Sequence, residues 1–352
     1  MDTAESPIPD DTESGGLPLP QLSPPPRRRS RGLVFAAAGA GLCALLAGLF
    51  VVGGWGSSAL GAMVDLEGPH TGGMHARLRG HMLGLSVEAH THDALERMSS
   101  APRFDRVTYK VQSGGTLADI GRIYGMETED LQALNPSVAP GAFIPPGGRV
   151  VLFKEGVGLS DVAPGTEERL YAGIPIVDGP GRHVRRRSRS WGTRTTVESL
   201  DAALRVYGQA YPEGPVIIVS DLSRRDGGKL KPHHSHREGR DVDLSYVPVP
   251  DQDNGGFLKM REGLFDVERN WTFYNALLAT GNVEVILMDT RLQKLLYDKA
   301  RADGMDEAEL GRLFQYPRPS DAEVGVIRHW EGHRDHTHIR FRCDPRHNVC
   351  PR

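Results

Sequence analysis

Residues 32–55 contain no charged side chain, and this run constrains the chain more than any other feature of its sequence. At about 1.5 Å per residue, a helix over this run is long enough to cross the hydrocarbon core of a membrane. Arginines are concentrated at positions 27–31, and the positive-inside rule keeps that side in the cytoplasm. The sequence therefore predicts one transmembrane helix, with the chain after Trp55 exported. A cleaved signal peptide is the alternative, because small residues follow the run, but the run and the preceding tail are long for one.

The segments on either side of this run lack the pattern of a hydrophobic core. Residues 1–31 are rich in proline, serine and acidic residues, which predicts a disordered cytoplasmic tail. Residues 56–105 show no clean hydrophobic period and are interpreted as a linker. Five histidines are scattered through the linker, but their spacings fit no single metal site, so we interpret them as solvated.

Composition narrows the class of the remaining chain. A length of 352 residues suggests two folded units besides these segments, and the charged and apolar fractions are ordinary for a globular protein. A net charge of −3 argues against a dedicated nucleic-acid-binding protein, which usually has a strongly basic face. Cys43 lies in the uncharged run, whereas Cys343 and Cys350 are compatible with one disulfide in an oxidising compartment.

The first folded unit is predicted between residues 106 and 154. Alternation over 107–111 indicates a strand, and Thr116 can cap a helix with apolar residues at helical spacing. Thr128 or Glu129 begins a second helix, and a Pro-Pro-Gly-Gly turn precedes a returning strand at 149–153. The order is strand, helix, helix, strand.

This unit resembles a LysM module. The opening Tyr109-Lys-Val-Gln-Ser-Gly-Gly-Thr-Leu is followed by Leu131-Gln-Ala-Leu-Asn-Pro and by Ile144-Pro-Pro-Gly-Gly, which match the later signatures of the family. Gly115 stands where the family usually has an acidic residue. The resemblance implies a module that binds N-acetylglucosamine-containing glycans such as peptidoglycan, and a spacer that has lost binding is the alternative. The glycan contacts that it implies are Gly114, Thr116 and Asn135.

The second folded unit is predicted over residues 166–352. Short apolar strands at 216–219 and 283–288 alternate irregularly with helices, one of them beginning near Thr290. This mixture favours an α+β fold with a central antiparallel sheet and flanking helices. Another helix has an apolar stripe of Val197, Leu200, Leu204 and Tyr207. The arginine-rich stretch at 181–190 is interpreted as a solvated basic loop, with attraction of an anionic wall polymer as the alternative.

Two short segments of the second unit, 233–244 and 333–341, contain six of the fourteen histidines of the chain. In the later segment, the alternation of a strand puts His336 and His338 on one face and Ile339 and Phe341 on the other. Two imidazoles side by side on a strand can share one metal site, so this face is the first candidate for metal binding.

The earlier segment supplies the third ligand. A strand beginning at Asp241 places Asp243 on its polar face, and His236 can fold back to the same point across the Glu238-Gly239 turn. Two histidines and one carboxylate form the ligand set of a catalytic zinc site, which leaves one position free for water. The predicted cofactor is one Zn²⁺ per chain. The predicted ligands are His236, Asp243 and His338.

Residues 168–352 resemble the penicillin-insensitive murein endopeptidases of the lysostaphin/D-Ala-D-Ala peptidase/hedgehog-type zinc superfamily. The motifs that carry the resemblance are Ser190-Trp-Gly-Thr-Arg-Thr-Thr, Ser220-Asp-Leu-Ser-Arg-Arg-Asp-Gly-Gly, His233-His-Ser-His-Arg-Glu-Gly-Arg-Asp-Val-Asp and His333-Arg-Asp-His-Thr-His-Ile-Arg-Phe-Arg-Cys. The resemblance implies the same three zinc ligands, with His233, His333 and His336 as the other active-site histidines. It also implies a disulfide between Cys343 and Cys350.

Roles follow for the residues around the ligands. His336, beside ligand His338, can take a proton from water or stabilise an oxyanion, and His333 can pass a proton to the leaving amine. Asp335 is a rival base, but strict alternation points it away from the metal. His234 and Asp241 are expected to be solvated or to support the ligands without binding the metal. Possible substrate contacts, or a merely solvated loop, are Asp221, Arg224 and Arg225.

These patterns together predict a zinc peptidase that hydrolyses peptide cross-links in peptidoglycan. The resemblance implies the D-alanyl–meso-diaminopimelyl bond, and the LysM module would hold the enzyme on its polymer. A D,D-carboxypeptidase acting on stem peptides and a non-catalytic wall-binding zinc protein are the alternatives. The predicted location is the bacterial inner membrane, as a single-pass protein with a cytoplasmic N-terminus and a periplasmic catalytic domain.

Overall fold

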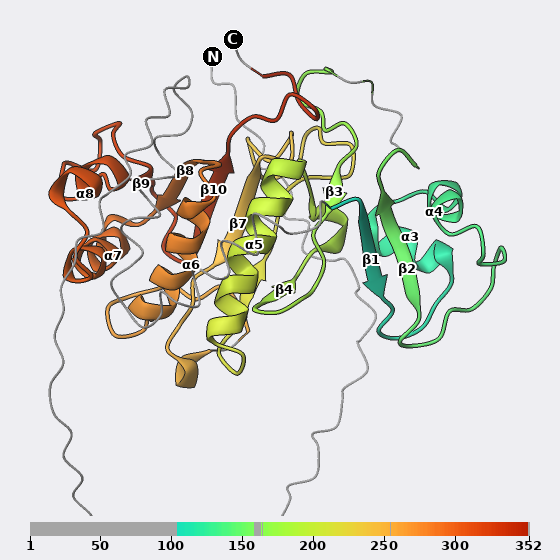
Figure 1. Ribbon diagram of the computed structural model, residues 1–352, viewed down its shortest axis with the longest axis horizontal. Helices are drawn as coiled ribbons and strands as arrows, with labels where there is room; N and C mark the ends of the chain where they lie inside the picture. The colour runs from blue at the N-terminus through green and yellow to red at the C-terminus, as the bar shows by residue number, and fades with distance from the viewer. Residues whose placement is uncertain (1–103, 158–162, 164, 254, 351–352) are drawn as a thin grey trace, which may run out of the picture. The chain divides into compact units, whose positions relative to one another are not determined.

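The computed structural model describes residues 104–157, 163, 165–253 and 255–350, which form a mixed α+β fold as the sequence predicts (Figure 1). The predicted tail, the uncharged run and nearly all of the linker lie outside these residues. Among the helices of the described ranges, none combines the length and apolar character needed to cross a membrane.

The helices and strands of the described residues follow one another along the chain. They are β1 Arg106–Lys110, α3 Leu117–Tyr124, α4 Thr128–Leu134, β2 Arg149–Lys154, β3 Ile174–Pro175, β4 Arg182–Val184, β5 Trp191–Gly192, α5 Arg194–Ala210, β6 Ile217–Val219, β7 Asp241–Ser245, α6 Val267–Ala279, β8 Val283–Met288, α7 Thr290–Ala302, α8 Glu307–Leu313, β9 Ile327–His329 and β10 His336–Phe341.

Residues 104–157 form a small module in which α3 and α4 pack against the antiparallel pair β1–β2. Thr116 begins α3 with a capping box, because its side chain accepts from the backbone of Asp119 and the Asp119 carboxylate accepts from the backbone of Thr116. Gly125 ends the helix at φ +66°, a left-handed conformation that favours glycine. The predicted strand–helix–helix–strand order is confirmed.

A six-stranded sheet in the order β4-β6-β7-β10-β8-β9 forms the centre of the rest of the chain. The central pairs β6–β7, β7–β10 and β10–β8 are antiparallel, as predicted, but both edge pairs, β4–β6 and β8–β9, are parallel. Parallel neighbours need a crossover, and helices provide it, with α5 between β4 and β6 and with α7 and α8 between β8 and β9. The prediction of an antiparallel sheet is therefore right for the centre and wrong for the edges.

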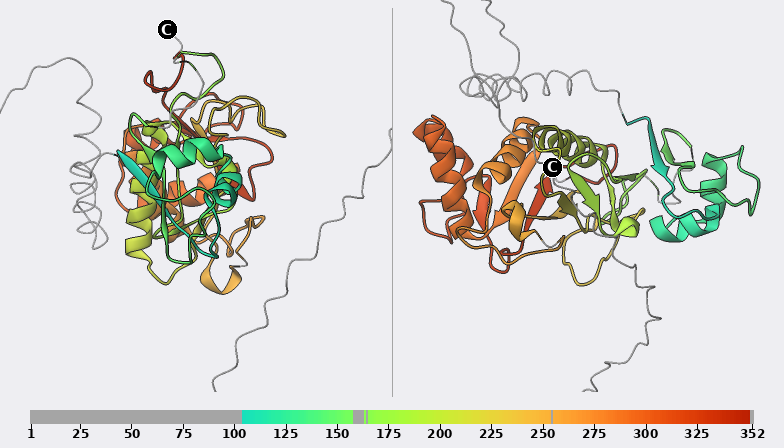
Figure 2. Two further views of the ribbon diagram at one scale, coloured as in Figure 1. Left: turned by 90° about the vertical axis from the view of Figure 1, so that its right-hand side faces the viewer. Right: turned by 90° about the horizontal axis from the view of Figure 1, so that it is seen from below.

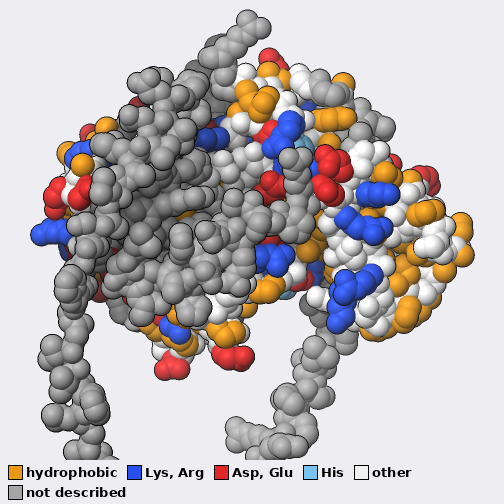
Figure 3. Space-filling view, in the orientation of Figure 1, with side chains coloured by type: hydrophobic (Ala, Val, Ile, Leu, Met, Phe, Trp, Pro, Cys, Tyr) orange, Lys and Arg blue, Asp and Glu red, His pale blue; other side chains and the backbone are white. Residues whose placement is uncertain are grey.

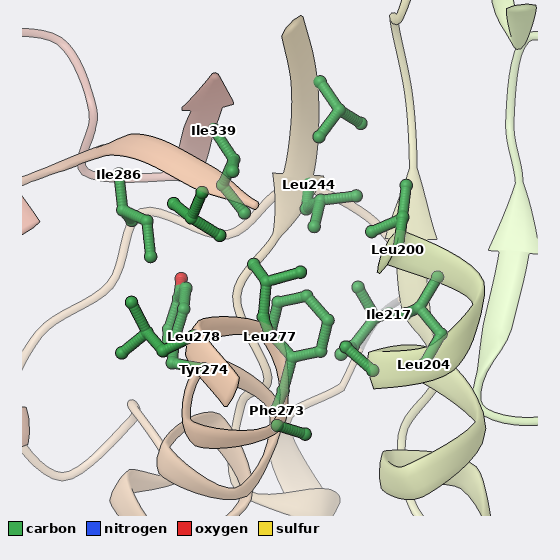
Figure 4. Close-up of a cluster of buried hydrophobic side chains, with 14 of the residues drawn as sticks. Leu200, Leu204, Ile217, Leu244, Phe273, Tyr274, Leu277, Leu278, Ile286 and Ile339 are labelled. Carbon is green, nitrogen blue, oxygen red and sulfur yellow. The ribbon is translucent and has the colours of Figure 1, made fainter. Parts of the chain in front are cut away.

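Helices α5 and α6 cover one face of this sheet (Figures 1 and 2). Their side chains meet those of the strands in a continuous core, in which Leu200 and Leu204 of α5 and Leu277 of α6 gather with Leu244 and Ile217 of the sheet (Figure 4). The predicted stripe of α5 is buried at all four positions. Helix α6 was not predicted, because its buried positions surround most of the helix and leave no polar face to reveal a period.

Strands β7 and β10 carry the predicted alternation. Val242 and Leu244 of β7 and Ile339 of β10 belong to the core under the helices, so their alternate neighbours face the other side of the sheet. The two strands are antiparallel neighbours, and His338 lies directly opposite Asp243 in the register. This pairing brings the two histidine-rich segments together across about a hundred residues of sequence.

The small module shares buried residues with the sheet domain. All described residues belong to one unit of the chain, and Trp191 and Leu170 complete the hydrophobic core of the module. The indole N–H of Trp191 donates to the backbone carbonyl of Tyr124 at 2.8 Å, in a buried setting. Arg225 pairs with Asp130 of the module. The module is thus packed against its neighbour rather than joined to it by a linker alone.

Two further features belong to the surface and the C-terminal segment. Where side chains are visible in Figure 3, basic and acidic groups are interspersed, so the visible face has no large area of a single sign. Cys343 and Cys350 form a disulfide just after β10, as the resemblance implied.

Candidate functional site

The three predicted ligands, His236, Asp243 and His338, lie together on the face of β7 and β10 that is turned away from the helices. The Nε2 atom of His236 is 3.2 Å from Nδ1 of His338 and 3.3 Å from Oδ1 of Asp243. Nδ1 of His338 is 3.0 Å from the same carboxylate oxygen. Three potential donor atoms, contributed by two strands and the turn before one of them, therefore form a small triangle.

This triangle has the size of one face of a tetrahedral zinc site. Zinc–ligand bonds of about 2.0–2.1 Å at tetrahedral angles place neighbouring ligand atoms about 3.3 Å apart. The three separations in this cluster lie between 3.0 and 3.3 Å. Two imidazole nitrogens and one carboxylate oxygen are also the donor types that zinc accepts, so these residues fit the metal.

Neighbouring acceptors determine which ring nitrogen of each histidine can bind a metal. The Nδ1–H group of His236 donates to the carbonyl of Leu222 at 2.9 Å, which leaves the lone pair on Nε2. The Nε2–H group of His338 donates to Oδ1 of Asp241 at 2.9 Å, which leaves the lone pair on Nδ1. In this tautomeric arrangement three electron-rich atoms face one another, and a cation between them would stabilise the cluster.

Asp241 contacts both of the predicted histidine ligands. Besides His338, its carboxylate accepts hydrogen bonds from the guanidinium of Arg340 at 2.8 and 3.0 Å and from the backbone N–H of His236 at 3.3 Å. Asp241 is only 2% exposed, which rules out the solvated alternative that the sequence left open. His234, which shared that expectation, is exposed.

Protons balance the charge of this cluster when no metal is bound. Burial lowers the pKa of His338, but its hydrogen bonds to Asp241 and Asp243 outweigh burial and raise that pKa to about 9. Burial raises the pKa of Asp243, but its close contacts with the His236 and His338 rings hold that pKa well below its usual range. At neutral pH the metal-free site therefore holds a protonated His338 between two carboxylates, where a divalent cation could replace the proton.

His233 lies at the edge of the cluster. Its ring centroid is 4.3 Å from that of His236, and one ligand atom from each of His233, His236 and Asp243 lies within 4.8 Å of the others. The Nε2 atom of His233 is 2.9 Å from Oδ2 of Asp221, and its Nδ1 is 3.6 Å from Oδ2 of Asp243. This predicted active-site histidine is thus close enough to meet a substrate or to supply a further ligand.

Asp221, predicted as a substrate contact, is buried beneath His233 instead. Its exposed fraction is 1%. Oδ2 accepts hydrogen bonds from Arg186 at 2.8 Å and from Arg189 at 3.1 Å, in addition to its contact with His233. A carboxylate enclosed in this way positions its three neighbours, and little of it is left to meet a peptide.

The two arginines predicted beside Asp221 have separate surroundings. Arg225 is 9% exposed and pairs with Asp130, so it joins the sheet domain to the small module rather than to a substrate. Arg224 is exposed at the surface. The two arginines therefore do not act together, and the substrate contact of Arg224 stays a prediction.

His336 and His333 lie on the other side of His338. The Nδ1–H group of His336 donates to the carboxylate of Asp335 at 2.7 Å, so Nε2 remains available to accept a proton. The ring centroid of His333 is 4.7 Å from that of His336 and 6.0 Å from that of His338. Burial is the main cause that lowers the pKa of His333, so its imidazole is neutral at neutral pH.

A tight turn places His236 against β7. His236 has φ +60°, an uncommon conformation for a residue with a side chain. At Gly239, with φ +67°, an added Cβ would lie 2.8 Å from the Cα of Gly192, so a larger residue would push the turn away. The strain at His236 is maintained by the buried contacts of its ring and backbone, which is typical of functional sites.

Two contacts of His336 were not predicted from the sequence. Strict alternation predicts that the rival base Asp335 faces away from the metal, but Asp335 lies just before β10 and contacts His336, so alternation does not apply to it. Phe257 stacks on the His336 ring, with centroids 5.7 Å apart and an interplanar angle of 11°. No pattern distinguishes a single aromatic residue in a loop, so nothing in the sequence pointed to Phe257.

Residues 109–153 match the LysM domain family, with the βααβ order described above. These residues form a LysM domain. LysM domains bind peptidoglycan. The match ends before His236, Asp243 and His338. No curated protein matches this chain.

The predicted glycan contacts of the LysM domain have clear roles in its fold. Asn135 is buried, and its side-chain amide donates to the carbonyls of Leu131 and Val151 and accepts from the N–H of Val151. Thr116 caps α3, and Gly114 adopts φ +76° in the preceding turn. Asn135 therefore joins α4 to β2, and its prediction as a glycan contact is not supported by this position.

Proposed function

We propose that this chain is a zinc-dependent endopeptidase that hydrolyses peptide cross-links in peptidoglycan. The observation that carries the proposal is the triangle of donor atoms from His236, Asp243 and His338, whose size and donor types suit zinc. The LysM domain supports the choice of polymer, because this family of modules binds peptidoglycan. The resemblance of the second unit to murein endopeptidases suggests the D-alanyl–meso-diaminopimelyl bond.

The ligand count favours catalysis over a purely structural role. Structural zinc sites are usually closed by four protein ligands that include cysteines, whereas catalytic sites have three ligands and an open position. The two cysteines of the described ranges are joined in a disulfide. Zinc in this site would polarise a peptide carbonyl and make hydroxide available at neutral pH.

His336 and Asp335 are proposed to handle the proton of the attacking water. The hydrogen bond from Nδ1–H of His336 to Asp335 fixes the ring and leaves Nε2 as the proton acceptor. Phe257 limits the rotation of the His336 ring by stacking on it.

His333 and His233 are proposed to complete proton transfer and substrate contact. His333 is neutral at neutral pH and lies next to His336, so it can relay a proton toward the leaving amine. His233 is held by Asp221 at the edge of the cluster, where its ring can contact the substrate.

Digestion of purified peptidoglycan by the full chain in detergent tests the proposal, with products identified by mass spectrometry. An endopeptidase converts cross-linked dimers into monomers, whereas a D,D-carboxypeptidase releases single alanine residues from uncross-linked stems. A non-catalytic wall-binding protein binds the polymer without changing it. Conversion of dimers should stop when a chelator is added and resume with Zn²⁺. Unchanged dimers at all zinc concentrations would exclude the endopeptidase.

The proposed location rests on the sequence before the described residues. The arginines at 27–31 and the uncharged run 32–55 suggest an inner-membrane protein whose catalytic domain is periplasmic. A reporter that is active only outside the cytoplasm, fused after the last residue of this chain, should be active. Activity of a cytoplasm-only reporter at that position would contradict the topology.

A further inference from the structure

Arg185 lies at the end of β4, close to the site but outside the cluster of ligands. Its backbone N–H donates to the carbonyl of Val219 at 2.9 Å, which extends the parallel pairing of β4 with β6 by one residue. Strand β6 in turn pairs with β7, which carries Asp243. The position of the Arg185 backbone is therefore fixed by the central sheet, although its side chain is exposed.

The guanidinium of Arg185 lies over the ring that stacks on His336. Its Cζ atom is 5.7 Å from the ring centroid of Phe257, and the Phe257 centroid is 5.7 Å from that of His336. A guanidinium stacked on an aromatic face is attracted by the ring while the N–H groups at its edge remain available. Phe257 thus connects an exposed cation to the histidine proposed to handle the proton.

The charge of Arg185 is not neutralised by the fold. In the parts of the chain that the structure describes, no carboxylate lies within 4 Å of its guanidinium, whereas Arg186 and Arg189 share Asp221. One carboxylate thus serves two of these three arginines, and the net charge of these four groups is positive. An anionic group of a ligand would find a partner at this position.

We propose that Arg185 binds a carboxylate of the substrate peptide, on the carbon that bears the scissile nitrogen. The inference rests on the proposed endopeptidase function and specifies its substrate. In a D-alanyl–meso-diaminopimelyl cross-link that carboxylate is free, and its planar shape suits two parallel hydrogen bonds from a guanidinium. Arg185 then determines specificity by placing the leaving-group half of the substrate beside His336.

Two dimeric muropeptides test this inference, one with the carboxylate free and the other with the same group amidated. The wild-type chain should cleave the free acid with the higher kcat/KM. Arg185→Ala should lose about 10- to 100-fold on the free acid and little on the amide, since a hydrogen bond to a charged group is lost. Most of the loss should be in KM. Arg185→Lys keeps the charge but not the paired N–H groups. Its kcat/KM on the free acid should lie between those of the wild type and Arg185→Ala.

Arg301→Ala is the matched control, because it removes an exposed arginine of α7 that is 63% exposed in its side chain. It should cleave both dimers as the wild type does. Zinc content and thermal unfolding of each variant verify that the fold is intact. If Arg185→Ala lowers kcat/KM equally on both dimers, the inference is overturned. The residue would then act only through Phe257 and the His336 ring.

The failure of the inference and the failure of the proposed function have different signatures. Cleavage of both dimers at equal rates by the wild type contradicts the carboxylate contact but keeps the endopeptidase. If the wild type cleaves neither dimer, the proposed endopeptidase function is contradicted. The affinities of the two dimers, measured by calorimetry, then test the contact with Arg185. If the wild type binds the free acid more tightly than the amide, and Arg185→Ala removes this difference, the contact is supported. Equal binding of the two dimers by the wild type would exclude it.

Discussion

The carboxylate of Asp241 accepts a hydrogen bond from Nε2 of His338 at 2.9 Å, on the side of the imidazole opposite to the predicted metal-binding nitrogen. The same carboxylate holds the backbone of His236 and is itself held by Arg340. Partners of this kind fix the tautomer and orientation of a metal-binding histidine. The relationship would make Asp241 a positioning residue for the proposed zinc ligands without being one of them.

Replacement of Asp241 should therefore weaken metal binding. Asp241→Asn removes the charge that holds the Nε2–H of His338, and zinc affinity should fall about 10- to 100-fold. Competition with a fluorescent chelator measures the affinity without reference to activity. Asp298→Asn, at an exposed position of α7, is the control and should bind zinc as the wild type does. Unchanged affinity in Asp241→Asn would mean that the contact does not orient His338.

His338 and His336 should respond differently to replacement by alanine. His338→Ala removes a proposed ligand, so both zinc content and activity should fall. His336→Ala leaves the three proposed ligands in place and removes the proposed proton acceptor, which should lower turnover by about 10²- to 10⁴-fold at nearly full zinc content. Metal analysis beside a muropeptide assay makes the comparison. If His336→Ala loses its zinc while His338→Ala keeps it, the roles of ligand and proton acceptor on this strand are the reverse of those proposed.

Zinc binding should release about one proton per site at neutral pH. The pKa of His338 in the metal-free protein is raised to about 9, and its Nδ1 must lose the proton to bind zinc. Apparent affinity should therefore fall about tenfold for each unit of pH below 9, until the carboxylates also titrate. Calorimetry in two buffers with different ionisation enthalpies gives the number of protons released. A value near zero would show that His338 is already neutral.

The raised pKa of His338 also predicts how the stability of the metal-free protein depends on pH. The folded pKa of His338 lies above its unfolded value, so its contribution is fully present below about pH 6.5. That contribution is lost as pH rises toward 9. Urea denaturation of the chelated protein at pH 6, 7.5 and 9 should show falling stability, and His338→Gln should flatten the trend. If stability falls equally steeply with pH in His338→Gln, other titrating groups cause the fall.

Trp191 should stabilise both the LysM domain and its neighbour. Trp191→Ala removes a side chain that is 1% exposed and completes the LysM core, so the free energy of unfolding should fall by about 3–5 kcal/mol. Trp191→Phe loses mainly the hydrogen bond to Tyr124, which is worth about 1 kcal/mol. Trp330→Ala, at a position that is 60% exposed, should change stability by less than about 0.5 kcal/mol. Equal stability of all three variants would indicate that this interface does not form in solution.

Helices and strands with a strong hydrophobic period could be predicted from the residues alone. The alternation of β10 and the stripe of α5 predict the buried faces correctly, because side-chain direction in a strand or helix follows from local backbone geometry. The LysM domain was also predictable, since its caps and turns are local. The pairing of His338 with Asp243 could be proposed because both residues lie on polar faces of predicted strands.

Local pattern does not reveal which of these faces meet or what surrounds them, because both depend on contacts between distant parts of the chain. The register of β7 against β10 selects Asp241 as the partner of His338, and a shift by one residue would turn both carboxylates toward the core. The contacts of Arg185 with Phe257 and of Trp191 with Tyr124 join residues far apart in the chain. Such contacts leave no local period in the sequence, because they arise from the packing of separate elements.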